Sequence, residues 1–254
     1  MRLRSNDFKL YVGLHQPSDA KHVRTCFLSI NRLRGKYGRK APLPAGMVEA
    51  VIDSAAFTEI MTHGRYRHST LEYARDAAPW CADPRVKALV AQDYMCEPAA
   101  PEKTRLTIAE HQRLTIERYD DLLASCAQLG VTTYILPVLQ GWSPEDYVAH
   151  LKAYGSRLAP GAWVGVGSVC KRQASPDVIV EILTAIKTER PDLRLHGFGV
   201  KLTALSDPRI ARLLATADSL AWSYSARKQG RSANDYREAL AFEAKVYDRL
   251  EKAA

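Results

Sequence analysis

Two apolar runs near the start of this chain end in a carboxylate, the group that most often moves protons in enzymes. Asp53 follows Val51-Ile52, and Asp93 follows a second run that ends near Ala91. Two acids at neighbouring strand ends can share general acid and base work, or divide into a nucleophile and a proton carrier as glycosyl transfer requires. Each aspartate could instead cap the turn or helix that follows it.

Two later runs end in groups suited to binding a planar ligand. Gln140-Gly141 closes one run and Gly165-Val166-Gly167 closes another. A glutamine side chain offers a donor and an acceptor to the edge of a heterocycle, and glycine lets a ligand approach the backbone closely. Strand bends and close packing would also account for these glycines. Together with the two acids, the endings indicate one pocket assembled from several strand ends.

Eight short apolar segments could supply these strand ends. They lie at 10–15, 26–31, 48–53, 88–93, 133–139, 163–168, 193–200 and 219–223. Helices with clear start signals separate the later segments. The segment 107–129 opens with a capping box and stops before Gly130, and Ser143, Ser175 and Asp207 each precede a proline at a first helical turn. A last helix is expected at 234–252.

Strand and helix alternate to the C-terminus, and the strands are continuous apolar runs, as buried parallel strands are. About eight such units in 254 residues favour an α/β fold of the (β/α)8 TIM-barrel class, with residues 1–254 as a single domain. The active site of such a barrel lies at the carboxyl ends of its strands. His15 could face that pocket, whereas His196 is expected to pack in the barrel core as a hydrogen-bonded imidazole.

The composition fits a soluble protein with an anionic partner. The net charge of +8 favours a polyanion without identifying one. No apolar run approaches the roughly 18 residues that cross a bilayer, and no signal peptide is recognisable, so we expect a cytoplasmic protein without membrane contact. The five cysteines are scattered, without metal-ligand spacing, which indicates buried thiols in a reducing compartment and no metal site.

Basic residues follow several of the strand segments and could contact phosphates. The candidate nucleic-acid-binding residues are Arg65, Arg67, Lys171, Arg172, Arg227, Lys228 and Arg231. Tyr37, Tyr66 and Tyr224 are interleaved with basic residues and could stack on bases. A solvated basic surface would also explain the charges, because lysine and arginine are abundant on any exterior.

The ordered set of endings resembles the motifs of tRNA-guanine transglycosylases. The motif Asp53-Ser54-Ala55-Ala56-Phe57 resembles their Asp-Ser-Gly-Gly-Phe, with alanine at both glycine positions. The segments 138–141, 164–167 and 195–200 resemble their Val-Gln-Gly, Gly-Gly and His-Tyr-Leu-Met-Gly-Val-Gly segments in the same order. The resemblance covers roughly residues 8–231 and points to the short branch that exchanges guanine in DNA for a 7-deazaguanine base.

The resemblance implies a base-exchanging pentosyltransferase whose polymer is DNA in preference to tRNA and whose incoming base is a 7-deazaguanine such as preQ0. Asp53 matches the family's acid/base aspartate. The residues that would contact the substrate are Ser54, Phe57, Asp93, Gln140, Gly141, Gly165 and Gly167. No cofactor is expected, and accessory modification proteins are possible partners.

The chain departs from the family pattern at two places. The family's nucleophilic aspartate ends the eighth strand, where this chain has Ala221, so the candidates are Asp218, if the strand register differs, or Asp53 itself. Without a nucleophile, the alternatives are a base-releasing N-glycosidase and a non-catalytic nucleic-acid-binding subunit. No cysteine follows Cys170, so we expect no zinc subdomain of the kind found in the tRNA enzymes.

Overall fold

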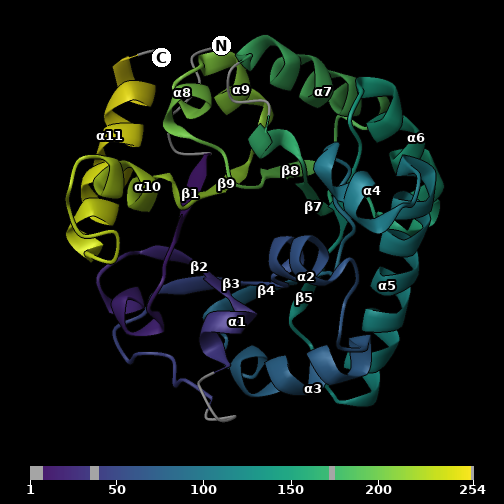
Figure 1. The fold of residues 1–254 in the computed structure, drawn as a ribbon, viewed down its shortest axis with the longest axis horizontal. Helices are drawn as coiled ribbons and strands as arrows, with labels where there is room; N and C mark the ends of the chain where they lie inside the picture. The colour runs from purple at the N-terminus through teal and green to yellow at the C-terminus, as the bar shows by residue number, and fades with distance from the viewer. Residues whose placement is uncertain (1–7, 35–39, 172–174, 253–254) are drawn as a thin grey trace.

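A ring of parallel strands surrounded by helices forms the core of the computed structural model, which describes residues 8–34, 40–171 and 175–252 (Figure 1). The strands are β1 (Lys9–Gly13), β2 (Thr25–Ser29), β3 (Glu49–Asp53), β4 (Val86–Val90), β5 (Tyr134–Leu136), β6 (Val138–Leu139), β7 (Trp163–Val166), β8 (Arg194–Gly197) and β9 (Thr216–Ser219). Their order in the sheet is β5-β4-β3-β2-β1-β9-β8-β7-β6, and all the pairs are parallel.

The two ends of this sheet belong to one segment of the chain, so the sheet forms a barrel. Only Pro137 separates β5 from β6, and β5 pairs with β4 while β6 pairs with β7. The carbonyl of Pro137 accepts a hydrogen bond from the Gly165 N–H at 2.8 Å, which continues the pairing across the interruption. Counting β5 and β6 as one strand gives eight positions, which confirms the predicted TIM-barrel class.

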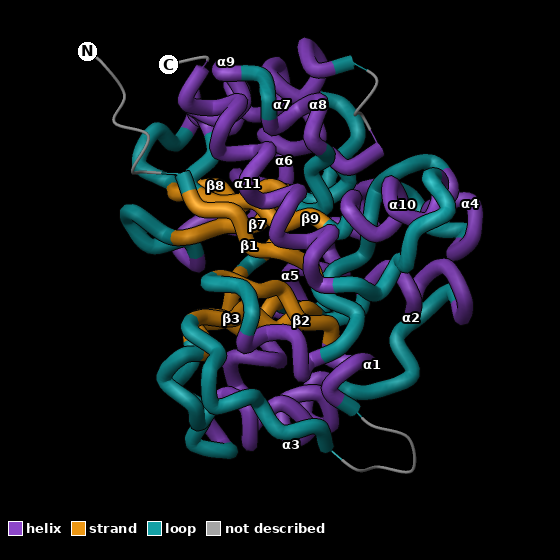
Figure 2. Tube along the Cα trace, turned by 90° about the vertical axis from the view of Figure 1, so that its left-hand side faces the viewer, coloured by secondary structure: helices purple, strands orange, loops and turns teal. Residues whose placement is uncertain are grey.

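Helices cover the outside of the barrel, and Figure 2 shows the strands lying between them. No helix among the described residues is long and apolar enough to cross a bilayer. The α-helices are α1 (Ile30–Leu33), α2 (Ala56–His63), α3 (Thr70–Cys81), α4 (Ala99–Thr104), α5 (Ile108–Gln128), α6 (Pro144–Tyr154), α7 (Pro176–Glu189), α8 (Leu202–Leu205), α9 (Pro208–Leu213), α10 (Ala221–Lys228) and α11 (Tyr236–Lys252). Short 3-10 turns lie at η1 (Pro17–Lys21), η3 (Gly155–Arg157) and η4 (Val169–Lys171).

The predicted helix starts are confirmed. Thr107 and Ser143 cap α5 and α6, and each receives the reciprocal hydrogen bond of a capping box. The helices α7 and α9 begin at Pro176 and Pro208, where a missing N–H costs nothing because the first turn has no internal acceptor for it.

Both faces of the strands are buried, which explains why they are continuous apolar runs. One large apolar cluster joins the outer face of the barrel to the helices. A separate cluster fills the barrel interior and consists of Tyr11, Phe27, Val51, Ala88, Val90, Leu136 and Val138, with Trp163 and Phe198 against it. The interior below the strand ends is therefore packed and holds no open channel there.

The last strand differs from the predicted one. The apolar pattern predicts a strand at 219–223, and this prediction is wrong, because β9 ends at Ser219 and α10 begins at Ala221. Trp222, Ser223 and Ala226 are the buried residues of α10, a spacing that matches one face of a helix. The shift places Asp218 inside β9, one residue before its end.

Candidate active site

A cavity of about 470 Å³ opens at the carboxyl ends of the strands. Every strand position of the barrel contributes to its wall: Gly13, Ser29, Asp53, Val90, Asp93, Gln140, Gly167, Phe198, Gly199 and Asp218 lie at or just after strand ends. Met95, Glu97, Ser168 and Phe57 come from the loops and helices that follow. The volume is within the range of small-molecule sites in proteins.

Asp53, the last residue of β3, lies opposite Ser29 of β2 in the strand register. Its Oδ2 accepts a hydrogen bond from the Ala55 N–H at 3.0 Å. The residue is partly exposed and lines the cavity. Burial of its carboxyl group raises the pKa to about 7, helped by the negative charge of Asp218. The hydrogen bonds from Ala55, Ser54 and Ser29 act in the opposite direction. A carboxyl group titrating near neutrality suits general acid and base catalysis.

The turn after Asp53 is strained. Ala55 has a φ of 62° and a ψ of 30°, the left-handed region that is unfavourable for any residue with a Cβ atom. This conformation directs the Ala55 N–H back at the Asp53 carboxylate and starts α2 immediately afterwards. Asp53 therefore receives the capping-type contact that the sequence left open, and it also faces the cavity.

Asp93 is buried and lies just beyond the end of β4, the strand that pairs with β3. The side-chain amide nitrogen of Gln140 donates a hydrogen bond to its Oδ2. Burial raises the pKa of Asp93 to about 7 against this hydrogen bond, and the charges of Asp53 and Glu97 add to the rise. The pKa values of Asp53 and Asp93 are thus both raised to about 7, by burial first and then by the negative charges that share the cavity.

The backbone around Asp93 is held from behind by Tyr66. The Tyr66 hydroxyl donates a hydrogen bond to the Asp93 carbonyl at 2.9 Å, and its ring is buried against Tyr94. Arg118 lies over the same ring, 4.5 Å from its centroid. The sequence suggested base stacking by Tyr66, which is wrong for this buried ring.

Gln140 is fixed on all sides. Its backbone N–H donates to the Nδ1 atom of His150 at 2.9 Å, and its carbonyl accepts from the Gln112 amide at 2.8 Å. Burial lowers the pKa of His150 to about 4, so this imidazole is neutral and can accept that hydrogen bond. The side-chain oxygen of Gln140 accepts from the Ser168 hydroxyl at 2.8 Å, which fixes the amide nitrogen toward Asp93.

Asp218 lies across the cavity from these groups, on β9. Its Oδ1 accepts a hydrogen bond from the Gly199 N–H at 2.9 Å and lies 3.3 Å from Nε2 of His196. The carboxyl group lines the cavity and is close enough to Asp53 to raise the pKa of that acid. Asp218 occupies the strand-end position that the sequence assigned to Ala221, because β9 ends earlier than predicted.

No sequence pattern indicated Glu97, and the sequence placed Ser168 at a strand end without assigning it a role. The Ser168 hydroxyl lies 2.7 Å from Glu97 Oε2 and 2.8 Å from Gln140 Oε1, and it accepts from the Glu97 N–H at 3.2 Å. Ser168 directly follows Gly167 and has a φ of 60°, a conformation that no sequence pattern announces. Among the described residues, no three His, Cys, Asp or Glu side chains converge closely enough to hold a metal ion.

The remaining substrate candidates fall into two groups. Phe57 lines the cavity mouth and is 52% exposed. Ser54, Gly141 and Gly165 are not among the described residues that line the cavity. Ser54 is buried behind the wall, and Gly165 lies under the ring of Phe198, where a Cβ atom would overlap it. A Cβ atom on Gly141 would meet the neighbouring α6 within 3 Å.

The basic candidates differ in how free their charges are. Arg67 forms an ion pair with the buried Glu59 at 2.7 Å, and Arg231 pairs with Glu238. Arg65 is exposed on the loop after α2, and Arg227 and Lys228 are exposed on α10. Lys171 ends the turn η4, and Arg172 and Tyr37 lie outside the described residues. Tyr224, 53% exposed, has Arg227 and Lys228 near its ring face.

His15 and Arg32 complete the cavity wall near α10. The Nε2 atom of His15 lies 2.7 Å from the Ser223 hydroxyl, and Arg32 lies 3.5 Å from its Nδ1. Burial lowers the pKa of His15, as do the charges of Arg32 and Arg227. Cys170 also lines the cavity and is partly exposed, whereas the other four cysteines are buried as expected.

The fold and the site define a (β/α)8-barrel protein whose strand ends bring Asp53, Asp218 and the amide-bound Asp93 to one cavity. The chain matches the family model DpdA, described as DeoxyPurine in DNA protein A, over residues 6–236, and it is a member of that family. The family carries out deazapurine modification of DNA by a transglycosylase-like activity. No curated protein matches the chain.

Proposed function

We propose that this protein replaces guanine in DNA by a 7-deazaguanine base of the preQ0 type, with Asp218 as the nucleophile and Asp53 as the proton carrier. The observation that carries the proposal is the meeting of Asp53 and Asp218 at one cavity that also contains the Asp93–Gln140 pair. DNA is favoured over tRNA because the family acts on DNA.

The Asp93–Gln140 pair supports recognition of a guanine edge. A carboxylate can accept from N1–H and the exocyclic amino group of guanine, and the second amide hydrogen of Gln140 can reach the O6 carbonyl. A 7-deazaguanine presents the same edge, so one pocket can bind the leaving and the incoming base in turn. The rings of Phe27 and Phe198 line the same cavity and offer apolar surface to a planar base.

The two facing acids can divide the chemistry of exchange. In the first half, an Asp218 oxygen attacks the sugar C1′, the C1′–N9 bond breaks, and the proton on Asp53 goes to the leaving guanine. In the second half, Asp53 takes the N9 proton of the incoming base, N9 attacks C1′, and the bond from C1′ to Asp218 breaks. The first half leaves Asp53 as a carboxylate and Asp218 as an ester, and the second half restores the proton on Asp53 and the charge on Asp218. The cycle therefore needs no oxidant, reductant or cofactor.

The hydrolytic and non-catalytic alternatives depended on a missing acid at position 221. Asp218 in the cavity supplies a carboxylate at that place and removes the reason to prefer either alternative. The target base must leave the DNA stack to reach the cavity, and the exposed charges of Arg65, Arg227 and Lys228 can hold the phosphates beside it.

The proposal is tested by incubating the protein with DNA that carries labelled guanine and with free preQ0, adding the proteins encoded nearby if required. We expect release of labelled guanine together with incorporation of the new base. Asp218→Asn should abolish both exchange and any covalent protein–DNA complex trapped by denaturation. Asp121→Asn, at an exposed aspartate on the barrel exterior, should leave exchange unchanged. Guanine release without incorporation would make the protein a glycosidase, and the absence of both would overturn an enzymatic function.

A further inference from the structure

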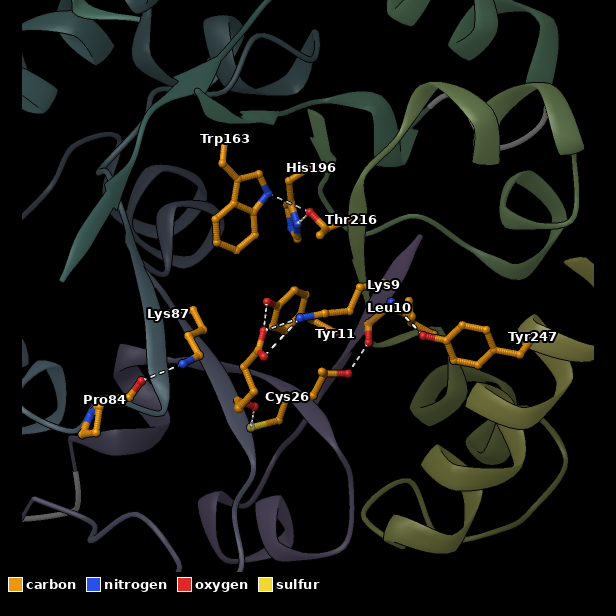
Figure 3. A network of polar contacts seen from close by, with 12 residues as sticks. Lys9, Leu10, Tyr11, Cys26, Pro84, Lys87, Trp163, His196, Thr216 and Tyr247 are labelled. Atoms are coloured by element: carbon orange, nitrogen blue, oxygen red, sulfur yellow. Dashed lines mark hydrogen bonds and ion pairs between the residues drawn. The ribbon is translucent and has the colours of Figure 1, made fainter. Parts of the chain in front are cut away.

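A chain of hydrogen bonds runs through the closed interior of the barrel and ends at Asp218. The indole N–H of Trp163 donates to the Thr216 hydroxyl at 2.8 Å, and this hydroxyl lies 2.8 Å from Nδ1 of His196. The Nε2 atom of His196 lies 3.3 Å from Asp218 Oδ1. The groups come from the adjacent strands β7, β8 and β9, and Figure 3 shows the hydrogen bonds of Trp163 and His196 meeting at Thr216.

The direction of donation along this chain follows from its two ends. An indole N–H can only donate, so the Thr216 oxygen accepts from Trp163, and a carboxylate can only accept, so the contact with Asp218 requires a hydrogen on Nε2 of His196. With the ring hydrogen on Nε2, Nδ1 accepts the hydrogen of the Thr216 hydroxyl. Thr216 and Asp218 together favour this tautomer of His196.

The surroundings of His196 leave its ring no other orientation. The side chain is fully buried, and the rings of Phe198, Phe27, Trp163 and Tyr11 surround it with centroids 4.8 to 6.2 Å away. Thr216 lies directly opposite His196 in the strand register, which fixes the partner of Nδ1. The imidazole does not line the cavity, so it reaches the chemistry only through Asp218.

We propose that His196 is a positioning residue that orients the Asp218 carboxylate for attack on the sugar carbon. Together with the Gly199 N–H, its Nε2–H holds Oδ1 from below and turns Oδ2 toward the cavity. The position of Asp218 near the end of β9 brings the nucleophile to the cavity, and the two donors fix the rotation of its carboxylate group. The inference rests on the proposed function, because it assigns a role in the same reaction.

The test compares three variants, two at His196 and one at its hydrogen-bond partner Thr216. His196→Phe keeps a flat ring among the aromatic residues but removes the donor, and we expect kcat for exchange to fall about 10- to 100-fold, as for outer-shell partners of reactive groups. The affinity for free guanine should stay within about twofold, because Asp93 and Gln140 remain. His196→Gln restores an N–H near the Nε2 position and should recover most of kcat. Thr216→Val should lower kcat to a smaller extent.

A second measurement does not depend on activity. Nitrogen-15 NMR of the imidazole should show the hydrogen on Nε2 in the unmodified protein, and Thr216→Val should increase the fraction of the other tautomer. If His196→Phe keeps full kcat, or if His196→Phe and His196→Gln lose kcat equally while both stay folded, the positioning role is overturned. If the unmodified protein exchanges no base at all, the proposed function fails first, and the NMR result alone decides whether the hydrogen-bond chain exists.

Discussion

The side-chain amide of Gln140 occupies the space that a Cβ atom on Gly167 would fill. Both backbone polar groups of this glycine are engaged, the N–H with Leu139 and the carbonyl with the Tyr147 hydroxyl. Because Gly167 has no Cβ atom, the side-chain amide of Gln140 can lie against its backbone. Gly167→Ala should push Gln140 away from Asp93, weaken guanine binding about tenfold or more, and destabilise the fold by about 1–3 kcal/mol through overpacking. Calorimetric titration with guanine and urea unfolding measure the two effects.

The control for this variant is Gly46→Ala. The added methyl group would meet Lys21, whose Cβ atom is the nearest at 3.1 Å, and neither residue lines the cavity. Guanine affinity should be unchanged. Unaltered affinity in Gly167→Ala would mean that the Gln140 amide does not contact the base.

The raised pKa of Asp53 predicts a pH-dependent cost to folding. Its carboxyl group titrates near 3.8 when exposed and at about 7 in the folded protein, so the folded state binds more protons between these values. The contribution of Asp53 to the free energy of unfolding is fully present below pH 3.8 and is lost as the pH rises through 7. Asp53→Asn should thus be more stable than the unmodified protein at pH 8, by at least about 1 kcal/mol, with a smaller difference at pH 5.

Urea unfolding at the two pH values measures this prediction, with Asp121→Asn as the exposed control. Asp121→Asn should change the free energy of unfolding by the same small amount at pH 5 and at pH 8. A constant difference between Asp53→Asn and the unmodified protein across this range would show that the acid titrates normally. The same pKa predicts that guanine release slows above pH 7, because Asp53 then lacks the proton it donates.

The two alanines that follow Ser54, Ala55 and Ala56, predict opposite effects of substitution by glycine. Ala55 is in the left-handed region, where a Cβ atom costs about 1–2 kcal/mol, whereas glycine costs about 0.4–1 kcal/mol in the unfolded chain. Ala55→Gly should therefore stabilise the protein by up to about 1 kcal/mol and keep the N–H contact to Asp53. Thermal unfolding and the exchange assay measure both consequences.

Ala56→Gly is the matched control at the next position. Ala56 is the first residue of α2, with ordinary helical geometry, so glycine should destabilise the protein by about 0.5–1 kcal/mol. Equal effects of the two substitutions would show that the strain at Ala55 is relieved elsewhere.

Much of the site follows from the sequence because parallel strands of a barrel end at one face. Once the alternation of strands and helices predicts that barrel, Asp53, Asp93 and Gln140 must come near one another. The capping boxes at Thr107 and Ser143 predict helix starts because they depend only on neighbouring residues.

The parts that the sequence did not predict depend on contacts between distant segments. Leu220-Ala221-Trp222 is apolar enough for a strand. The helix α10 is favoured by contacts with distant residues, among them the Trp222 indole N–H with the Gly13 carbonyl and the Ser223 hydroxyl with His15. The contacts of Ser168 with Glu97 require a positive φ at Ser168 and the loop that follows β4, which is distant in sequence. Local propensity carries no information about either arrangement.

The exposed charges of α10 predict how binding to DNA depends on salt. Arg227 and Lys228 lie on α10, the helix that follows the cavity-lining Leu220, and both charges lie near the exposed ring of Tyr224. If each contacts one phosphate, the double substitution to alanine should reduce the slope of log K against log salt by about 2 and weaken binding to all sequences alike. Fluorescence anisotropy with a labelled duplex at several salt concentrations measures the slope.

The matched control removes two exposed charges at the opposite end of the barrel, Lys87 near the start of β4 and Arg212 near the end of α9. It lowers the net charge by the same amount, so a general electrostatic effect would reduce both slopes equally. A direct phosphate contact predicts a larger reduction for the α10 pair, because counterions are released only where the helix meets the backbone of the DNA. Equal slopes in the two double variants would mean that Arg227 and Lys228 do not contact the phosphates. The proposed chemistry in the cavity would not be affected by that result.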